Sequence, residues 1–265
     1  MLLIIKALLL AALGHFIIIS AALGQDHRDA AVAAARKIYP LDMAPNSVDD
    51  QYEGCREKMA NLVVKKYLKK EFKDASKKDN KNATPPEDNL TSDHLSAIYI
   101  YTGNHVYNKF TNAVRNEKQN YKDKTFEWYS LHFFLTDAIQ ILNKAQNACI
   151  STFRGTNVKF NLDVLNKDVR FGTFTSSSLD RAVAKGFGKV SCFEIITCEG
   201  ANITKYSNYP GEKEVLIPPY ETFNIINVTN RTDENNLWCN TVYTLESTGA
   251  KSDRNCALFN KPIKN

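Results

Sequence analysis

The sequence predicts an α+β protein in which helices come first and strands follow. Between residues 51 and 148, apolar residues recur at three- and four-residue steps, the spacing of one face of a helix. From Cys149 onward, short apolar runs alternate with turn-forming residues, as in strands. Because no β-α-β alternation links the two parts, an α+β fold is favoured over a doubly wound parallel sheet.

The first 24 residues are typical of a secretory signal peptide. Lys6 precedes apolar runs, and Ala22-Leu23-Gly24 places small residues at the last and third-last positions before a cleavage site at Gln25. A membrane anchor is disfavoured, because glycine and polar residues interrupt a stretch that barely reaches the ~20 residues of a span. We expect a secreted protein with a single domain over residues 25–265, mainly helical to about residue 148 and mainly β over residues 149–265.

Other features agree with secretion. All six cysteines follow the expected cleavage site, and an even number favours disulfides in an oxidising compartment, although spacing alone does not choose the pairs. The polar C-terminal tail lacks a lipid-anchor signal, so we expect no stable membrane insertion. N-glycosylation is expected at five Asn-x-Thr sequons, which begin at Asn82, Asn89, Asn202, Asn227 and Asn230.

Composition excludes several other classes of protein. With 43% hydrophobic and 24% charged residues, the chain is neither disordered nor of low complexity. A net charge of +5 is too small to predict a nucleic-acid partner. The run of Lys65, Lys66, Lys69 and Lys70 is interpreted as a solvated helix face rather than a polyanion site. The cysteines and histidines show no zinc-like pairing, so no metal site is predicted.

Periodicity and turn signals place the individual elements. Helices are expected around residues 59–67, through 98–101 behind an N-cap at 91–93, over 106–115 and over 126–145. Strands are expected over residues 149–154, 169–175, 190–197, 202–206, 214–217, 222–228 and 237–245. Among the strands, one helix is expected over residues 179–187, capped by the serines before it. Residues 74–89 are expected to form a glycosylated surface loop, and His132 is interpreted as structural.

Two strand ends in the second half carry candidate site residues. Arg154 ends an apolar strand, where an arginine is costly unless an anion meets its planar donor fork. Gly155 beside it allows the backbone to approach a ligand closely, although a structural salt bridge is the favoured alternative for Arg154 alone. Side chains alternate along the other strand, so Ser176 and Ser178 share one side, and Ser176 can face a pocket while Ser178 caps the following helix.

A pair of glutamates, Glu212 and Glu214, begins a further strand. Residues two apart on a strand point to the same side, about 6 to 7 Å from each other. Two carboxylates on one side repel each other unless a cation or an electron-poor centre lies between them, which indicates chemistry. Two solvated glutamates on an exposed strand are the alternative for this segment alone.

Four segments in this order resemble the arginine-specific mono-ADP-ribosyltransferase family of vertebrate cell-surface and secreted enzymes. They are Phe153-Arg154-Gly155, residues 170–178, residues 184–188 and residues 212–219, and they contain the arginine, serine and glutamate of the family's R-S-E signature. The resemblance implies a helical N-terminal part packed on a split β-core with an NAD-binding cleft. It also implies that NAD is the co-substrate and that the acceptor is an arginine-bearing protein or free arginine.

The resemblance further implies a role for each residue of the signature. Arg154 would hold the NAD phosphates, and Ser176 would support the nicotinamide ribose and the catalytic glutamate. Phe187 would stack on the nicotinamide. Glu214 would be the catalytic residue, and Glu212 would separate transfer to arginine from simple NAD hydrolysis.

Gly155 and Ser178 complete the set of residues that we expect to bind NAD. The family pattern also pairs Cys55 with Cys256 and Cys149 with Cys198, and it leaves the remaining two cysteines unassigned. Cleavage of the nicotinamide–ribose bond passes through an oxocarbenium-like transition state, which a fixed carboxylate stabilises. Two alternatives stay open: an NAD glycohydrolase on the same fold, and a catalytically silent secreted glycoprotein.

Overall fold

The computed structural model describes residues 37–72, 88–103 and 105–259, and these residues form two compact units. The smaller unit pairs β1 (Ile38–Tyr39) with β3 (Lys159–Phe160) as a parallel two-stranded ladder. The larger unit contains all the other described helices and strands. The expected signal peptide and most of the expected loop at residues 74–89 lie outside the described residues, so the single domain over residues 25–265 stays a prediction.

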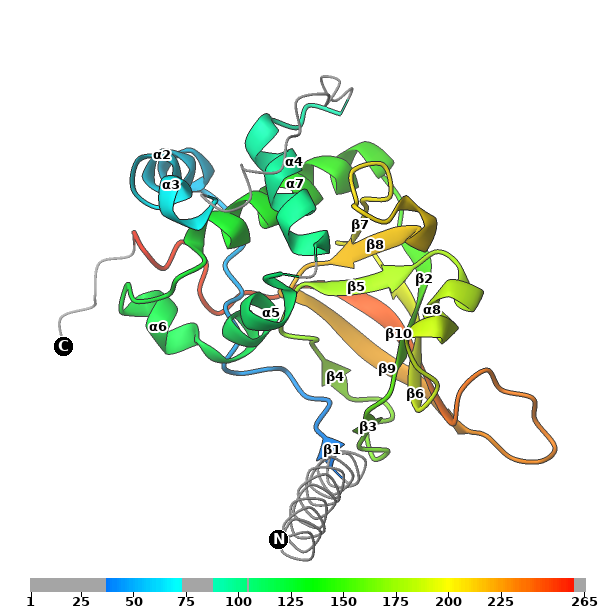
Figure 1. Ribbon diagram of the computed structural model, residues 1–265. Coiled ribbons are helices and arrows are strands. Elements are labelled where there is room, and N and C mark those ends of the chain that lie inside the picture. The colour runs from blue at the N-terminus through cyan, green and yellow to red at the C-terminus, as the bar shows by residue number, and fades with distance from the viewer. Residues whose placement is uncertain (1–36, 73–87, 104, 260–265) are drawn as a thin grey trace, which may run out of the picture. The chain divides into compact units, whose positions relative to one another are not determined.

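The helices expected in the first half are confirmed, with shifts of a few residues at their ends (Figure 1). Thr91 is the N-cap of α4: its hydroxyl accepts the His94 N–H, while the His94 ring accepts the Thr91 N–H at 2.8 Å. The bounds are α2 (Arg56–Lys66), α3 (Leu68–Glu71), α4 (Ser92–Thr102), α5 (Tyr107–Asn116), α6 (Lys118–Lys122) and α7 (Tyr129–Gln146).

Eight strands of the larger unit form one sheet, in the order β4-β9-β10-β6-β2-β5-β8-β7. β10 and β6 run parallel, and the other neighbours are antiparallel. The ladder between β2 and β5 has a single register pair, Phe153 and Ser178, so the sheet is split between them, as the resemblance implied. The bounds are β2 (Ile150–Thr156), β4 (Asp168–Val169), β5 (Thr175–Ser178), β6 (Ser191–Thr197), β7 (Ala201–Asn202), β8 (Glu214–Ile217), β9 (Glu221–Asn230) and β10 (Thr241–Ala250).

The continuous strand predicted over residues 169–175 is wrong, since β4 and β5 cover only its two ends. Between them the Arg170 side chain is buried, and its Nη1 forms an ion pair with Asp49 Oδ2 at 2.6 Å. Gly172 adopts a φ of +65°, which an extended strand does not allow. A buried charge and a left-handed glycine therefore interrupt a segment whose residue types favour a strand.

Two other predicted strands are shorter than expected. The strand at residues 202–206 ends at once, because the Asn202 side chain accepts the Thr204 N–H at 3.0 Å and turns the chain. The strand predicted over residues 237–245 begins only at Thr241, and Trp238 and Cys239 before it are buried in a cluster with Ala184 of α8 (Arg181–Phe187).

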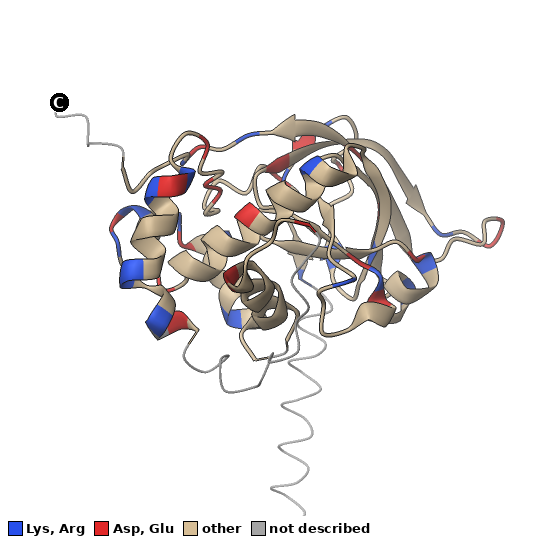
Figure 2. Ribbon diagram, turned by 90° about the horizontal axis from the view of Figure 1, so that it is seen from above, with Lys and Arg blue, Asp and Glu red and all other residues tan. Residues whose placement is uncertain are grey.

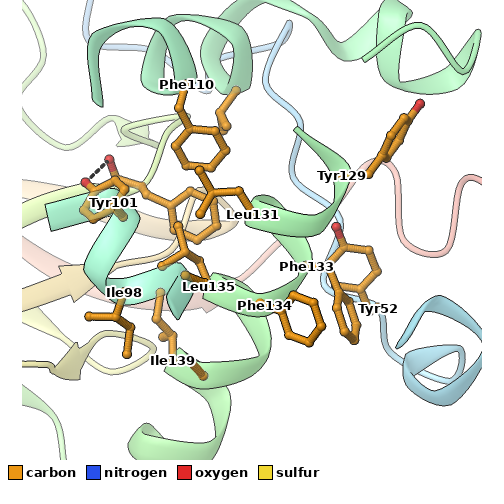
Figure 3. Packing of buried hydrophobic residues seen from close by; sticks show 14 of the residues in the cluster. Tyr52, Ile98, Tyr101, Phe110, Tyr129, Leu131, Phe133, Phe134, Leu135 and Ile139 are labelled. Carbon is orange, nitrogen blue, oxygen red and sulfur yellow. Dashed lines mark hydrogen bonds between the residues drawn. The ribbon is translucent and has the colours of Figure 1, made fainter. Parts of the chain in front are cut away.

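The main hydrophobic core fixes the helices against one part of the split sheet. Tyr101, Phe110 and Leu135, from α4, α5 and α7, lie together in this core (Figure 3). Phe174 and Leu216 join them from the segment before β5 and from β8. The strands that carry Ser176 and Glu214 are therefore positioned by helices from the first half of the chain.

His132 is buried within the helical core, as the sequence analysis expected of a structural histidine. Its Nδ1 accepts the Tyr52 hydroxyl at 2.7 Å, and its Nε2 donates to the Val48 carbonyl oxygen at 3.0 Å. Burial lowers the pKa of His132 to about 4, so the ring is neutral at physiological pH. The interpretation of His132 as structural is confirmed.

Three disulfides join all six cysteines. Cys55–Cys256 and Cys149–Cys198 are the two pairs that the resemblance implied. Cys192–Cys239 is the third, and both of its residues are buried. The family pattern had left Cys192 and Cys239 unassigned. They can pair because β6, which contains Cys192, lies beside β10, which Cys239 precedes.

Charged residues of both signs are interspersed along the described elements (Figure 2). Lys65, Lys66 and Lys69 are exposed on α2 and α3, in agreement with the interpretation of a solvated face. Within the described ranges, no helix combines the length and the apolar character that a bilayer crossing requires.

Candidate active site

A cavity of about 410 Å³ lies in the larger unit, where the sheet is split between β2 and β5. This volume is in the range of sites for small molecules and cofactors. All the site residues that the sequence analysis proposed line it, although they come from four separate segments. The lining residues are Tyr101, Thr102, Gly103, Tyr107, Phe153, Arg154, Gly155, Thr156, Asn157, Ser176, Ser177, Ser178, Ala184, Phe187, Tyr209, Glu212 and Glu214.

Arg154 lies on β2 at the point where the sheet splits. Its Nη1 donates a hydrogen bond to the Ser176 carbonyl oxygen at 2.5 Å, which ties β2 to β5 across the split. No carboxylate of the described residues comes within 4.0 Å of its guanidinium, so the structural salt bridge considered as the alternative is not formed there. The planar donor fork is therefore not neutralised by a close acid and lines the cavity, where an anionic ligand can meet it.

Ser176 is held by a tyrosine from the helical half of the chain. Its Oγ lies 3.1 Å from the Tyr101 hydroxyl, which also donates to the Phe174 carbonyl oxygen. Sequence reasoning missed Tyr101 as a site residue. The available signal was a tyrosine on the buried face of α4, because a buried hydroxyl needs a polar partner.

Ser178 has a different role from the helix cap that was expected. The N-cap of α8 is Asp180, whose Oδ1 accepts the Ala182 N–H at 2.9 Å. The Ser178 hydroxyl donates instead to the Glu212 carbonyl oxygen at 2.7 Å and accepts the Asp180 N–H at 3.0 Å. Its hydroxyl therefore supports the segment that carries Glu212.

Glu214 is the first residue of β8 and lies opposite Ser178 in the ladder with β5. It is only 4% exposed, and the Ser207 hydroxyl donates to its Oε2 at 3.3 Å. Burial raises the pKa of the Glu214 carboxyl above its usual range, and the charge of Glu212 acts in the same direction. Hydrogen bonding from Ser176 and Ser207 opposes this rise. The site therefore contains a buried carboxyl with a perturbed pKa, as functional acids often have.

Glu212 lies in the same cavity as Glu214, but the reason given for this by the sequence was wrong. Glu212 ends the 3-10 helix η1 (Pro210–Glu212) and is not part of a strand. Lys213 between the two glutamates has a φ of 49°, in the left-handed region, so strand alternation does not apply across it. Burial raises the pKa of the Glu212 carboxyl as well.

Gly155 and Phe187 both line the cavity, but Gly155 is required for a reason that was not predicted. A Cβ on Gly155 would lie 2.2 Å from the Ala184 carbonyl oxygen, so the missing side chain allows α8 to pack on β2. Phe187 ends α8 and is 55% exposed. The close packing of β2 and α8 therefore places an aromatic ring at the edge of the cavity.

Replacing Gly155 by alanine is expected to destabilise the fold, because the new methyl group meets backbone atoms that cannot move alone. Overpacking of this kind costs about 1–3 kcal/mol, and urea denaturation with the disulfides intact measures it. Gly186→Ala is the matched control, since a Cβ there meets nothing within 4 Å. Equal stability of Gly155→Ala and Gly186→Ala would contradict the packing role.

The described residues contain no group of three or more His, Cys, Asp or Glu side chains that could hold a metal ion. The cavity offers a guanidinium, several hydroxyl groups, aromatic rings and two carboxylates. The guanidinium can donate to the phosphates of a dinucleotide, the carboxylates can accept from its ribose hydroxyls, and an aromatic ring can stack on its base. We therefore expect an organic anion in the cavity.

The fold and the site together define a class of protein. In ADP-ribosyltransferases, an arginine, a serine and a glutamate surround one cavity at a split sheet of an α+β fold. The chain matches the family model described as NAD:arginine ADP-ribosyltransferase over residues 41–247. It therefore belongs to this family, and the fold class expected from the sequence is confirmed.

Curated relatives and a solved structure agree with the family assignment. T-cell ecto-ADP-ribosyltransferase 2 of Mus musculus is 36% identical over 215 residues, which cover 76% of this chain and 72% of that protein. GPI-linked NAD(P)(+)--arginine ADP-ribosyltransferase 1 of Oryctolagus cuniculus is 37% identical over 218 residues, 72% of this chain and 67% of that protein. A variant of the mono-ADP-ribosyltransferase ART2.2, solved in complex with NAD, superposes with a TM-score of 0.65 at 32% identity and covers 83% of this chain and 99% of that one. Because the family is described by its use of NAD and a similar structure contains NAD, the prediction of NAD as co-substrate is confirmed.

Proposed function

We propose that this protein transfers ADP-ribose from NAD to arginine side chains of other proteins and releases nicotinamide. The observation that carries the proposal is that Arg154, Ser176, Glu212 and Glu214 line one cavity, although they come from distant segments. A guanidinium and a buried carboxyl in one cavity can bind the two parts of NAD that matter for its cleavage, the phosphates and the ribose.

Cleavage of NAD breaks the bond between the nicotinamide nitrogen and the ribose carbon. Positive charge develops on the ribose as this bond lengthens, and a fixed carboxylate stabilises that charge most in the transition state. Glu214 has this role, because it is buried, and its Oε2 accepts the Ser207 hydroxyl. Arg154 holds the phosphates, and Phe187 lies against the nicotinamide at the edge of the cavity.

Transfer then forms a bond between the ribose carbon and a nitrogen of the acceptor arginine. A guanidinium is protonated at neutral pH and is a poor nucleophile until a base takes one of its protons. Glu212 has this role, because it lies in the same cavity as Glu214 and is less buried than it. The electron pair of the broken bond leaves with nicotinamide, and the proton goes to the Glu212 carboxylate.

Replacing Glu212 by glutamine is expected to lower transfer by about 100-fold, the scale of losing a positioned general base, while NAD hydrolysis changes little. The amide keeps the shape of the side chain but accepts no proton. Labelled NAD with and without free arginine measures the two activities in one preparation. An equal loss of both activities would contradict the division of roles between Glu212 and Glu214.

The assay with labelled NAD and free arginine also distinguishes the transferase from the two alternatives. An NAD glycohydrolase releases free ADP-ribose and leaves the acceptor unlabelled, and a silent glycoprotein releases neither product. The position of Glu212 in the cavity favours the transferase, because hydrolysis alone does not need a base for a guanidinium.

We also propose that the protein is secreted and N-glycosylated. The three disulfides support an oxidising compartment. Among the sequon asparagines in the described ranges, Asn89, Asn202, Asn227 and Asn230 are all exposed. Asn82 lies outside the described residues.

A further inference from the structure

The segment that carries Glu212 is held to the start of α8 by three consecutive residues. Ser178 Oγ donates to the Glu212 carbonyl oxygen at 2.7 Å, and the Leu179 N–H donates to the Lys213 carbonyl oxygen at 3.0 Å. The Lys213 ammonium then donates to Asp180 Oδ2 at 2.9 Å. Each of the three residues therefore contributes one bond to residues 212 and 213.

The Asp180 carboxylate connects two structural elements. Its Oδ1 accepts the Ala182 N–H at the first turn of α8, while its Oδ2 accepts the Lys213 ammonium. Lys213 holds a left-handed conformation, with a φ of 49°, that a lysine rarely adopts. Contacts outside the residue favour this conformation: backbone bonds join Lys213 to Pro210 and Leu179, and the ion pair with Asp180 adds a side-chain contact.

The two glutamates differ in how their positions are determined. Glu214 belongs to β8, which pairs with β5 and β7, and its carboxylate accepts the Ser207 hydroxyl. Within the described part of the chain, the Glu212 carboxylate accepts no hydrogen bond from any donor. The position of the Glu212 carboxylate therefore depends on the backbone bonds that hold residues 212 and 213, whereas Glu214 is also held by strand pairing and by a bond to its carboxylate.

We propose that the ion pair between Lys213 and Asp180, the Lys213 clamp, holds Glu212 where it can take a proton from the acceptor arginine. The inference rests on the proposed function and extends it, because it makes Lys213 and Asp180 positioning residues for transfer but not for NAD cleavage. Both side chains are partly exposed, 53% for Lys213 and 35% for Asp180, so solvent weakens the pair and its loss leaves the fold intact.

Substitutions can remove the Lys213 clamp without removing the helix cap. Asp180→Asn keeps an oxygen for the Ala182 N–H but loses the charge that faces Lys213. Lys213→Met keeps a long side chain and loses the ammonium, whereas Lys213→Arg keeps a cation. The matched control is Lys185→Met, which removes an exposed lysine of α8 that has no ion pair with a described residue.

Transfer to free arginine and NAD hydrolysis without acceptor are measured on the full secreted chain of each variant. Asp180→Asn and Lys213→Met are expected to lower transfer about fivefold, the scale of an exposed ion pair, and to leave hydrolysis within about twofold. The double variant is expected to lose no more than either single variant, and Lys213→Arg to keep most of the transfer. An unchanged ratio of transfer to hydrolysis, or an equal fall of both, overturns the proposal.

A second measurement does not depend on enzyme activity. Hydrogen exchange of residues 206–214, followed by mass spectrometry, is expected to be faster in Asp180→Asn and Lys213→Met than in wild type and Lys185→Met. Identical exchange in all four proteins overturns the Lys213 clamp. If wild type labels no arginine but exchange responds as expected, the proposed function fails and the Lys213 clamp stands as a structural device.

Discussion

Replacing Glu214 by glutamine is expected to reduce both NAD hydrolysis and transfer by on the order of 100-fold or more. Glutamine has nearly the same shape and can still accept the Ser207 hydroxyl, which lies 3.3 Å from the carboxylate. It carries no negative charge, however, and the positive charge that develops on the ribose is then left without a partner in a buried site. Both activities should fall together, because both begin with the cleavage of NAD.

Release of labelled nicotinamide under single-turnover conditions measures this loss directly. Glu246→Gln is a matched control, since Glu246 is exposed on β10 and does not line the cavity. Affinity for NAD is expected to change little, because Glu214 acts mainly in the transition state. A loss of less than tenfold would show that Glu214 is not the main source of transition-state stabilisation.

Replacing Arg154 by lysine is expected to raise the KM for NAD about 30-fold or more, from a cost of roughly 2 kcal/mol for a charged hydrogen-bond partner. Lysine keeps the positive charge but loses the planar fork that binds a diphosphate at two points. It also loses the bond from Nη1 to the Ser176 carbonyl oxygen, which joins β2 to β5. The affinity for NAD should therefore fall even though the charge is retained.

Initial rates over a range of NAD concentrations measure the change in KM. Arg231→Lys is the control, because Arg231 is exposed in the segment between β9 and β10, outside the cavity. A KM for Arg154→Lys within twofold of wild type would mean that charge alone, and not the fork, binds the phosphates. A fall in kcat with unchanged KM would instead place Arg154 in the chemical step.

Local pattern was sufficient for most of the elements. α7 follows from an apolar face repeated over five turns, and β8 was expected over the residues at which it is found. The strand expected over residues 169–175 failed, because Arg170 forms an ion pair with Asp49, which is far away in the sequence. Periodicity describes only the neighbours along the chain, so it cannot foresee an interruption that a distant charge causes.

The candidate site, like the fold, was predictable only where residue type and local pattern were enough. Arg154, Ser176 and Glu214 were identified from their residue types and from a family resemblance, and the cavity brings them together. Tyr101 was missed, because its contact with Ser176 joins a helix and a strand that are far apart in the sequence. Gly155 was singled out for the approach of a ligand, and the structure adds a second reason for the glycine, since the backbone of α8 packs closely against it.

By itself, the sequence predicted the order of helices and strands, the family, and three side chains that line the candidate site. Only the tertiary structure decided that Cys192 pairs with Cys239, that Asp180 caps α8, and that Lys213 adopts a left-handed conformation between the two glutamates. The physical reason is the range of the interactions. Side-chain periodicity acts over a few residues, whereas disulfides, ion pairs and close backbone packing depend on segments that only folding brings together.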